Sequence, residues 1–530
     1  MKTLKIRLLL PDKQTAYLKI DPSRSDQRLA DAMENAGYGL NTRCGGRGLC
    51  RGCRVHYRDA NGTTQTLRAC QTTLAEIPPA ANRLQIPKSS WSDQSLYGVS
   101  SFDIHPQLNP YHHPRPGIGL ALDIGTTTLA GMLWDLENGH ALADHAIANP
   151  QRTYGDDVLS RISYATEHAS GRRRLRQRLF QYGLAPLLQT LCRQANCSLD
   201  AVSEATLAGN PVMLHTVLGE SLDGFAKYPF KPEFLEARTV ALTDLRPGAP
   251  LPAILLPSLA PFVGADIVAG AFAAGMLNEA APTLLIDFGT NGEILLKHAG
   301  GYLTTATAAG PAFEGGRLAC GASAGPGVLS AITHEGGQWS YHLCQPCSSG
   351  SEPEGISGAA YVDFIALALE RGLLNRFGRF DRAHPDVSLL EDADGSCKHI
   401  IRLSPHTWIS EVDVAELLQA KAAIAAGVAV LLEIAGLQAC DLRKVYIAGG
   451  FGYHLNTSHA HRIGLLPSVE KKCFETIGNA SLGGASACLL QNSYRNLAPL
   501  LENCQSIELN LMPEFSDHYT DGLLLEPFTS

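Results

Sequence analysis

A polar glycine turn occurs twice in this chain of 530 residues, each time directly after an apolar run. The first copy is LALDIGTTTL at residues 120–129, and the second is LLIDFGTNGEI at residues 284–294. In both copies an aspartate ends the apolar run and a Gly-Thr pair follows. A short apolar run that stops at a glycine turn is typical of a buried strand, and a repeated unit indicates two similar halves. We therefore expect two α/β lobes that face one another.

Both turns contain the groups that bind a phosphate chain and its magnesium ion. Such a ligand needs backbone N–H groups, hydroxyl donors and a carboxylate that can hold the water shell of the ion. The candidate residues are Asp123, Gly125, Thr126, Thr127 and Thr128 in the first turn, Asp287, Gly289, Thr290 and Asn291 in the second. One such turn alone also occurs in ordinary hairpins, so the prediction depends on the pair and on a third segment.

The third segment is a glycine turn near the C-terminal end of the chain. Residues 445–448 predict a strand, and Gly449, Gly450 and Gly452 follow it. Glycines after a strand allow a ligand to approach the main chain closely, and adenosine could lie there. A helix is predicted just before this strand, at residues 412–435. Together the three segments predict a nucleotide site.

Four cysteines near the N-terminus have the spacing of an iron–sulfur ligand set. Cys44, Cys50 and Cys53 lie in one glycine-rich loop, and Cys70 follows a predicted hairpin. Four thiolates suit a [2Fe-2S] cluster, and free amides in such a loop can donate to its sulfurs. The five residues between the first two cysteines resemble the adrenodoxin-like ferredoxins more than the plant type, which has four. A structural zinc site is the alternative, although zinc ligands usually form two closely spaced pairs.

The surrounding sequence predicts a small domain and a linker. Residues 1–87 combine alternating strands with one helix, which agrees with a β-grasp ferredoxin fold. Residues 88–117 lack periodicity and predict a linker; residues 118–280 and 281–530 then form the two lobes. Cys344 and Cys347 make an isolated CxxC pair, and the sequence identifies no partners with which it could bind metal.

Composition excludes several classes of function. The net charge is −8, with a basic N-terminal part and an acidic remainder. The acidic part contains no basic stripe interleaved with aromatic residues, so nucleic-acid binding is not expected. No uninterrupted apolar run reaches the length of a membrane span, and the opening residues lack a signal-peptide core. The cytoplasm is therefore the expected location, and the fourteen cysteines are expected there to be thiols or metal ligands instead of disulfides.

Over nearly its whole length the chain resembles the reductive activators of corrinoid proteins, cluster-bearing members of the superfamily that includes acetate and sugar kinases, heat-shock ATPases and actin. The matching motifs are CGGRGLCRGC at 44–53, RACQT at 68–72, NPQ, YGDDV and RI within 149–162, GNPVMLH at 209–215, DFGTNGE at 287–293, TAAGPAFEG at 307–315 and AGGFG at 448–452.

The resemblance implies a two-lobed actin-like (ASKHA) ATPase fused to a [2Fe-2S] domain. Such a protein takes electrons from a donor through its cluster and uses ATP to reduce a partner's cobalt(II) corrinoid to cobalt(I). By position, Asp123 and Asp287 would organise magnesium and water, the threonines and Asn291 the phosphates, and residues 449–452 the adenosine. A homodimer is suggested only by the resemblance.

Several interpretations stay open at this point. Glu314 and Glu293 are candidates to position water, or are salt-bridged structural glutamates; His215 orients a partner group or is a satisfied core histidine. The basic run 172–178 is a solvated face or a docking surface. The linker looks shorter than in longer family members, and GISGAA at 355–360 replaces an expected GICGSG-like turn. Two other functions remain: an electron carrier whose nucleotide fold only senses ATP, and a phosphotransferase with a regulatory cluster.

Overall fold

The structure is a computed structural model that describes residues 4–11, 14–20, 25–36, 38–40, 53–87, 90, 112–246, 248–280, 282–322, 325, 327–335, 338–344, 352–353, 355–391 and 397–528. Cys44, Cys50, Cys347 and most of the predicted linker lie outside the described residues.

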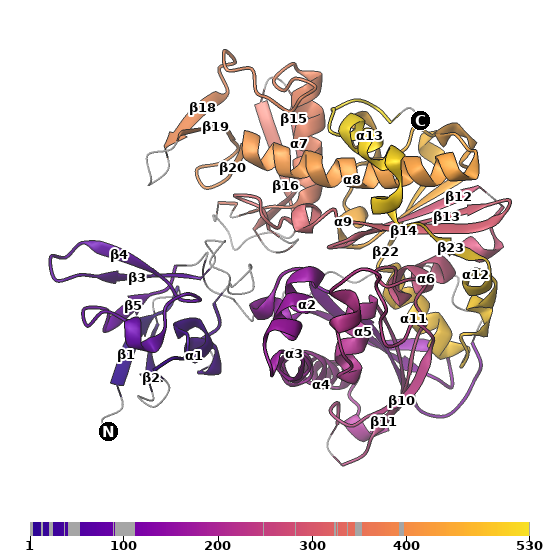
Figure 1. The fold of residues 1–530 in the computed structure, drawn as a ribbon, viewed down its shortest axis with the longest axis horizontal. Coiled ribbons are helices and arrows are strands. Elements are labelled where there is room, and N and C mark those ends of the chain that lie inside the picture. Colours follow the sequence, from indigo (N-terminus) through magenta and orange to yellow (C-terminus); the bar gives the residue numbers. More distant parts are fainter. Residues whose placement is uncertain are drawn as a thin grey trace.

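The N-terminal part forms a five-stranded sheet in the order β2-β1-β5-β3-β4, which stands to one side of the rest in Figure 1. Its elements are β1 (Leu4–Leu9), β2 (Thr15–Ile20), α1 (Leu29–Asn35), β3 (Arg54–Arg58), β4 (Thr64–Arg68) and β5 (Arg83–Gln85). Ile6 pairs with Leu18 in the predicted antiparallel hairpin, and both side chains are buried because alternate residues face the core. β4, whose residues are mostly polar and exposed, pairs antiparallel with β3 and forms the second strand of the hairpin predicted before Cys70.

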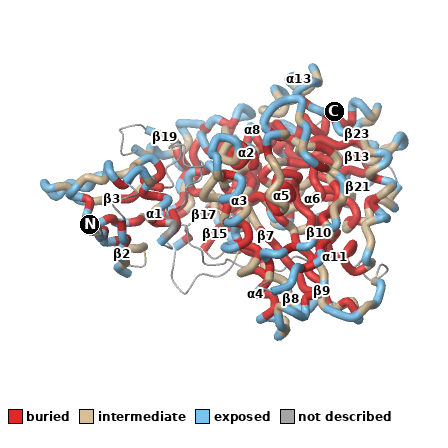
Figure 2. The backbone as a smooth tube through the Cα atoms, turned by 60° about the horizontal axis from the view of Figure 1, so that its bottom comes forward, coloured by how far each residue is buried: buried red, intermediate tan, exposed pale blue. Residues whose placement is uncertain are grey.

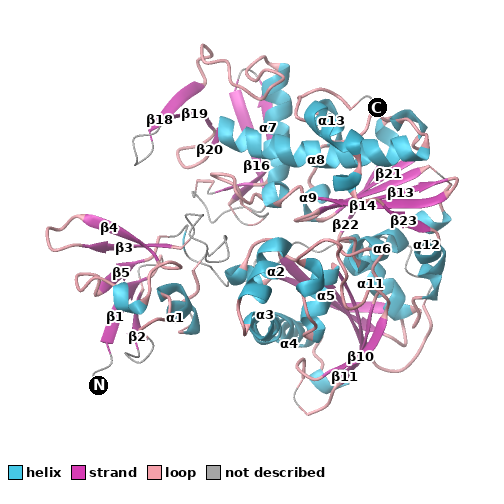
Figure 3. Ribbon diagram, in the orientation of Figure 1, coloured by secondary structure: helices cyan, strands magenta, loops and turns pink. Residues whose placement is uncertain are grey.

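The first of two large sheets has six strands in the order β10-β11-β9-β6-β7-β8. The strands are β6 (Ile118–Ile124), β7 (Thr128–Asp135), β8 (His140–Ala148), β9 (Val202–Gly209), β10 (Arg238–Leu242) and β11 (Leu251–Leu255). The helices of this part are α2 (Val158–Glu167), α3 (Gly171–Leu179), α4 (Ala185–Gln194), α5 (Pro211–Leu218) and α6 (Ala265–Ala273). Figure 3 shows these helices beside the sheet.

The second large sheet repeats this arrangement in the order β22-β21-β12-β13-β14-β23. Its strands are β12 (Thr283–Phe288), β13 (Gly292–His298), β14 (Gly301–Thr307), β21 (Lys444–Ala448), β22 (Phe474–Gly478) and β23 (Cys504–Ser506). β6 pairs with β7 antiparallel and with β9 parallel; β12 pairs with β13 antiparallel and with β21 parallel. The two copies of the aspartate turn therefore stand at equivalent places in two similar sheets, as the sequence repeat predicted.

Helices and two small sheets complete the second half. The helices are α7 (Gly358–Glu370), α8 (Glu411–Ala435), α9 (Gly450–Tyr453), α10 (Thr457–Arg462), α11 (Ala480–Leu490), α12 (Ala498–Glu502) and α13 (Pro513–Gly522). The small sheets contain β15 (Val328–Glu335), β16 (Gln338–Leu343) and β17 (Gly355–Ile356), then β18 (Val387–Glu391), β19 (Cys397–Arg402) and β20 (Trp408–Ser410). α11 crosses back and packs against α6, β6 and β9 of the first half.

The predicted helix at 412–435 is confirmed as α8. Ser410 caps its start through Asp413, and Gly436, at φ 65°, ends it in the left-handed conformation that glycine adopts readily. α8 is long and apolar enough to cross a membrane, but 83% of its most apolar stretch is buried within the protein. Figure 2 shows the buried interior into which such central helices pack. Burial in the core accounts for its composition.

Candidate nucleotide site

The two aspartate turns meet across a cavity of about 370 Å³. The Oγ1 atoms of Thr127 and Thr290 lie 2.7 Å apart, although one belongs to the first half of the chain and the other to the second. Most of the residues predicted to bind a nucleotide line this cavity: Asp123, Gly125, Thr126, Thr127, Thr128, Asp287, Gly289, Thr290, Asn291, Glu314, Gly449 and Gly450. Gly452 is not among the lining residues, because it packs against Ile447 instead.

The first turn is held in place by hydrogen bonds that its backbone carbonyls accept. Asn149 Nδ2 donates to the Gly125 carbonyl at 2.8 Å, and the Asn149 N–H donates to the Thr127 carbonyl at 2.7 Å. The buried Arg161 donates to the Thr126 carbonyl between them. At Gly125 a Cβ would lie 2.4 Å from the Thr128 carbonyl oxygen, so only glycine fits this tight turn.

Asp123 is held in place by two donors from the start of α11. Asn479 Nδ2 donates to one carboxylate oxygen at 2.9 Å and Ser481 Oγ donates to the other at 2.8 Å. Burial raises the pKa of Asp123, while these two hydrogen bonds oppose the rise. Because α11 comes from the second half of the chain, no local sequence pattern identified either partner.

Asp287 has a different environment on the opposite side of the cavity. Burial, together with the negative charges of Asp266, Asp123 and Glu314, raises its pKa to about 8. Unlike the carboxylate of Asp123, its side chain accepts no hydrogen bond from the described residues. The carboxyl therefore lies ready for a ligand that brings positive charge.

Asp266, in the first turn of α6, is the residue that the sequence analysis missed. It lines the same cavity, and burial, followed by the charge of Asp123, raises its pKa to about 7. Glu293 lies nearby, and its pKa is raised by burial and by Asp266 and Asp287. Asp266 stands alone in an apolar helix start, so no motif or spacing could have identified it.

The charge of the cavity is strongly one-sided. Five carboxyl groups line it, whereas none of its described lining residues is a lysine or an arginine. Cations would lower the repulsion between a polyphosphate and those of these carboxyl groups that are ionised. No group of three or more potential ligands converges at metal-binding distance among the described residues. Carboxylate oxygens are ligands that Mg²⁺ accepts, usually one or two of them with several water molecules retained.

Glu314 connects the two turns. Thr127 Oγ1 donates to its carboxylate at 2.7 Å, and Thr290 Oγ1 donates to the same oxygen at 3.2 Å. Burial raises the pKa of Glu314, and these hydrogen bonds and the charge of Arg152 oppose the rise. No described residue forms a salt bridge with it, so the geometry favours the interpretation in which Glu314 faces the ligand site.

The glycine turn at Gly449 forms another wall of the cavity. Gly449 has φ 89°, and a Cβ there would lie 2.6 Å from the Phe288 carbonyl oxygen. Ser357, in the unusual GISGAA segment, also lines the cavity and caps α7 by accepting a hydrogen bond from the Ala360 N–H at 3.3 Å. Serine at this position therefore has a local structural role. Cys344 lines the cavity as well.

His215 is a satisfied core histidine rather than a ligand residue. Its side chain is fully buried, its ring stacks on Phe234 at a centroid distance of 4.1 Å, and Nδ1 lies 2.7 Å from the Pro211 carbonyl oxygen. Asn210, five residues earlier in the same motif, reaches the site instead. Its Nδ2 donates to Thr126 Oγ1 at 2.9 Å.

Two of the four proposed cluster cysteines are described. The Sγ atoms of Cys53 and Cys70 lie 3.1 Å apart in the buried core of the N-terminal domain. Cys44 and Cys50 lie outside the described residues, as does Cys347. The fold therefore brings two buried thiols from separate segments into contact.

Comparison with known proteins gives a consistent result. The family described as the C-terminal domain of RACo, the ASKHA domain, matches residues 281–528, and the RACo middle region matches residues 118–279. The corrinoid activation enzyme RamQ of Eubacterium limosum is 27% identical over 94% of this chain and 96% of its own length. A [Co(II) methylated amine-specific corrinoid protein] reductase of Methanosarcina barkeri is 26% identical over 77% of this chain and 76% of its own length.

One solved structure has a similar fold over the whole length. It is a reductive activator for a corrinoid, iron-sulfur protein, with a TM-score of 0.70 and 25% identity, and the match covers 98% of each chain. The ASKHA fold that the family resemblance implied is thus confirmed by sequence and by structure.

Proposed function

Because the chain belongs to the RACo family of reductive activators of corrinoid proteins, we propose that it uses ATP to drive reduction of a partner's cobalt(II) corrinoid to cobalt(I). The contact between Thr127 and Thr290 supports the ATP dependence of this proposal, because it brings the two candidate phosphate-binding turns together in one cavity lined by carboxyl groups. The named relatives act on corrinoid proteins, and this supports a corrinoid methyl-transfer protein as the partner.

Some residues of the cavity are suited to bind Mg²⁺ and others to bind the phosphates. Asp123 and Asp287, which lie just before the two turns, would hold Mg²⁺ and its water molecules, and Asp266 lies in the same cavity to support them. Thr126 to Thr128 and Thr290 with Asn291 would donate to the phosphates. A magnesium ion supplies charge neutralisation for the leaving and attacked phosphate oxygens.

Glu314 would act on the attacking water. Its carboxylate oxygen lies between the hydroxyls of the two turns, and a general base must be within hydrogen-bond reach of the proton that it removes. Gly449 and Gly450 would leave room for the adenosine side of the nucleotide against the main chain.

The N-terminal domain would supply the electron. A [2Fe-2S] cluster held by Cys44, Cys50, Cys53 and Cys70 provides one-electron chemistry when bound. The contact between Cys53 and Cys70 supports this ligand set, as does a mixed sheet in which α1 connects β2 and β3.

ATP is needed because the reduction is uphill. For one electron, each ~59 mV between the donor and cobalt(II) potentials changes the equilibrium tenfold. Closure of the two halves around a nucleotide is a source of the missing free energy, since it can change how the corrinoid partner is bound. The cytoplasmic location and the homodimer stay predictions.

Partner-stimulated ATP hydrolysis tests this proposal. The reconstituted protein is mixed anaerobically with a cobalt(II) corrinoid protein, and phosphate release is measured with the partner present and absent. We expect stimulation by the partner, and its loss in Asp287→Asn. A small-molecule phosphoryl acceptor that becomes phosphorylated instead would favour a phosphotransferase. Equal reduction of acceptors with and without ATP would favour a plain electron carrier.

A further inference from the structure

The exposed face of the N-terminal sheet is basic throughout. Alternate residues of a strand point to opposite faces, and one face of this sheet is buried with α1, around Ile6, Leu8 and Met33. Every strand contributes a lysine or an arginine to the other face, and none of the five strands contains an aspartate or a glutamate. These cations are exposed, apart from the half-buried Arg54, and they are Lys5, Arg7, Lys19, Arg54, Arg58, Arg68 and Arg83.

The pairing of the strands sets like charges side by side. The paired cations are Lys5 with Lys19, Arg7 with Arg83, and Arg54 with Arg68. Because paired residues share a face, and like charges directly opposite one another destabilise a sheet, this arrangement costs the domain stability. Charged residues on edge strands protect a sheet from aggregation, but β1, β3 and β5 are interior strands. The interior cations therefore point to a role outside folding.

Three arginines form a row across the interior strands. The antiparallel register of β3 and β5 places Arg58 across from Arg83, and Arg83 is paired with Arg7. Tyr17 of β2 continues the row, because it pairs with Arg7 and is 57% exposed. Arginine and tyrosine are residue types enriched at the centres of binding interfaces. The row, defined as Arg58, Arg83 and Arg7, is therefore the part of the face best suited to contact a partner.

One end of the basic face adjoins the two described cysteines of the proposed cluster. Cys53 directly precedes Arg54, and Cys70 follows Arg68 by two residues. The two Sγ atoms lie 3.1 Å apart, so both strand ends lead to the same place. Arg54 is four residues from Arg58 along β3, which is about 13 Å at the usual rise of a strand. A protein that covers the row therefore also lies close to these cysteines.

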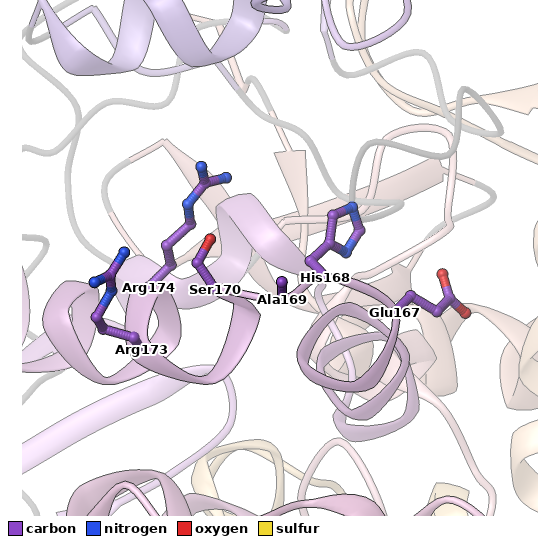
Figure 4. Close-up of a pocket in the computed structure, with 6 residues that line it drawn as sticks. All are labelled: Glu167, His168, Ala169, Ser170, Arg173 and Arg174. Atoms are coloured by element: carbon purple, nitrogen blue, oxygen red, sulfur yellow. The ribbon is translucent and has the colours of Figure 1, made fainter.

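A second basic surface, on the first lobe, differs from this face. It is the pocket at residues 167–174, where Figure 4 shows Glu167 on the same corner as Arg173 and Arg174. Arg174 donates to the Tyr164 hydroxyl at 3.3 Å. This surface has mixed charge and belongs to a part of the chain without the cluster cysteines, so the basic sheet face is the stronger candidate for a redox partner.

The composition of the sheet face fits a short-lived complex with an acidic protein. Tyr17 is the one exposed large hydrophobic side chain among the described residues of this domain, whereas stable interfaces have an apolar centre. Electron-transfer complexes are small and transient, and opposite charges speed such encounters by about 10- to 10³-fold. Under the proposed function, a donor must reload the cluster in this way. The corrinoid partner, by contrast, depends on the lobes where ATP acts.

We propose that the electron donor is an acidic one-electron carrier protein that docks on this basic face, with the row at the centre of the contact. The inference rests on the proposed function, because it names the partner that reduces the cluster. One electron leaves the reduced carrier and enters the oxidised cluster, and no bond or proton changes place. The acidic remainder of the chain is not the occupant, since the face is exposed in the full chain with both lobes present.

The first test measures binding, which does not require a loaded cluster. The probe is a plant-type [2Fe-2S] ferredoxin, an acidic carrier, titrated in its oxidised form into the full chain by calorimetry at low ionic strength. The triple variant Arg7→Gln/Arg58→Gln/Arg83→Gln should raise Kd at least about tenfold. The triple variant Arg7→Lys/Arg58→Lys/Arg83→Lys keeps the charge and should bind nearly as wild type does. Added salt should weaken binding more in wild type than in the glutamine variant.

The second test follows reduction of the anaerobically reconstituted protein in a stopped-flow instrument. Reduced ferredoxin is compared with reduced methyl viologen, a small cation that needs no docking surface. The glutamine variant should be reduced at least about tenfold more slowly by ferredoxin, and no more slowly by viologen. It should also melt no lower than wild type, because like charges have been removed. The control Lys471→Gln/Lys472→Gln/Arg495→Gln removes three exposed cations of the second lobe and should leave both rates unchanged.

Several results would overturn the inference. Equal Kd and equal rates in wild type and the glutamine variant refute docking on this face, and equal slowing with both reductants makes the arginines supports of the cluster. Normal loading with slower reduction of a cobalt(II) corrinoid protein assigns the face to that partner. Tighter binding of a single-stranded oligonucleotide than of ferredoxin assigns it to nucleic acid. A wild type without iron refutes the proposed cluster instead, and calorimetry then still decides whether the face binds the carrier.

Discussion

Replacing Glu314 with glutamine should tighten nucleotide binding while it slows hydrolysis. Glutamine keeps the size of the side chain and its ability to accept from Thr127 and Thr290, but it removes the negative charge and the proton acceptor. The two parts of the prediction have opposite signs, because the carboxylate repels the phosphate that it helps to cleave.

The size of the binding effect follows from the contact with Thr127. A phosphate oxygen that shares the Thr127 hydroxyl lies within about 5 Å of the Glu314 oxygen, because each hydrogen bond spans about 2.7 Å. Two unit charges at that separation, with an effective dielectric constant of about 20, repel by about 3 kcal/mol. Mg²⁺ offsets part of this, so we expect a gain of about 1–3 kcal/mol, or about 5- to 150-fold in affinity. Loss of a general base lowers turnover about 10²- to 10⁴-fold.

The assay combines calorimetric titration with a non-hydrolysable analogue and steady-state phosphate release in the presence of Mg²⁺. Glu137→Gln, an exposed glutamate at the turn between β7 and β8, is the control and should behave as wild type. Weaker analogue binding in Glu314→Gln, or turnover within threefold of wild type, would refute the assigned role. Glu314 would then only brace the two turns.

Four further outcomes are expected. Asp287→Asn should raise the melting temperature of the nucleotide-free protein, and the increase should grow from pH 5 to 8. The folded-state pKa of about 8 lies above the unfolded value, so the wild type loses stability as the pH rises through that window. A difference in melting temperature that does not depend on pH would contradict this prediction. Arg161→Met should lower the free energy of unfolding in urea by about 3 kcal/mol, because it leaves buried carbonyls without donors; a loss below 1 kcal/mol would argue against it. Gly449→Ala should weaken analogue binding, since φ 89° and the Phe288 carbonyl disfavour a Cβ, and unchanged affinity would count against the assigned wall. Cys70→Ser should reduce the iron and acid-labile sulfide of the anaerobically purified protein, and a full iron complement would exclude this ligand.

The parts of the fold that depend on local pattern were predictable. The apolar runs before Asp123 and Asp287, the glycines after them and the capped helix α8 are all readable in windows of a few residues. The repeat also predicted two similar sheets, because one recurring unit must bury its strands in the same way.

The contacts between the two halves were not predictable. Glu314 meets Thr127 only because the lobes close on one another, and Asn479 and Ser481 reach Asp123 because α11 crosses back to the first sheet. Asp266 carries no motif at all. Such contacts depend on tertiary placement, so a single sequence identifies the residue types of the site but not the partners that set their charge.

Formation of cobalt(I) with and without ATP is the most direct test of the coupling between the two domains. The reduced, cluster-loaded protein is mixed anaerobically with a cobalt(II) corrinoid protein and Mg²⁺, and the cobalt(I) absorption is followed over time. The account predicts that cobalt(I) accumulates only when ATP is added, and that Asp287→Asn or Cys70→Ser abolishes it. Accumulation at the same rate and extent without ATP would contradict it.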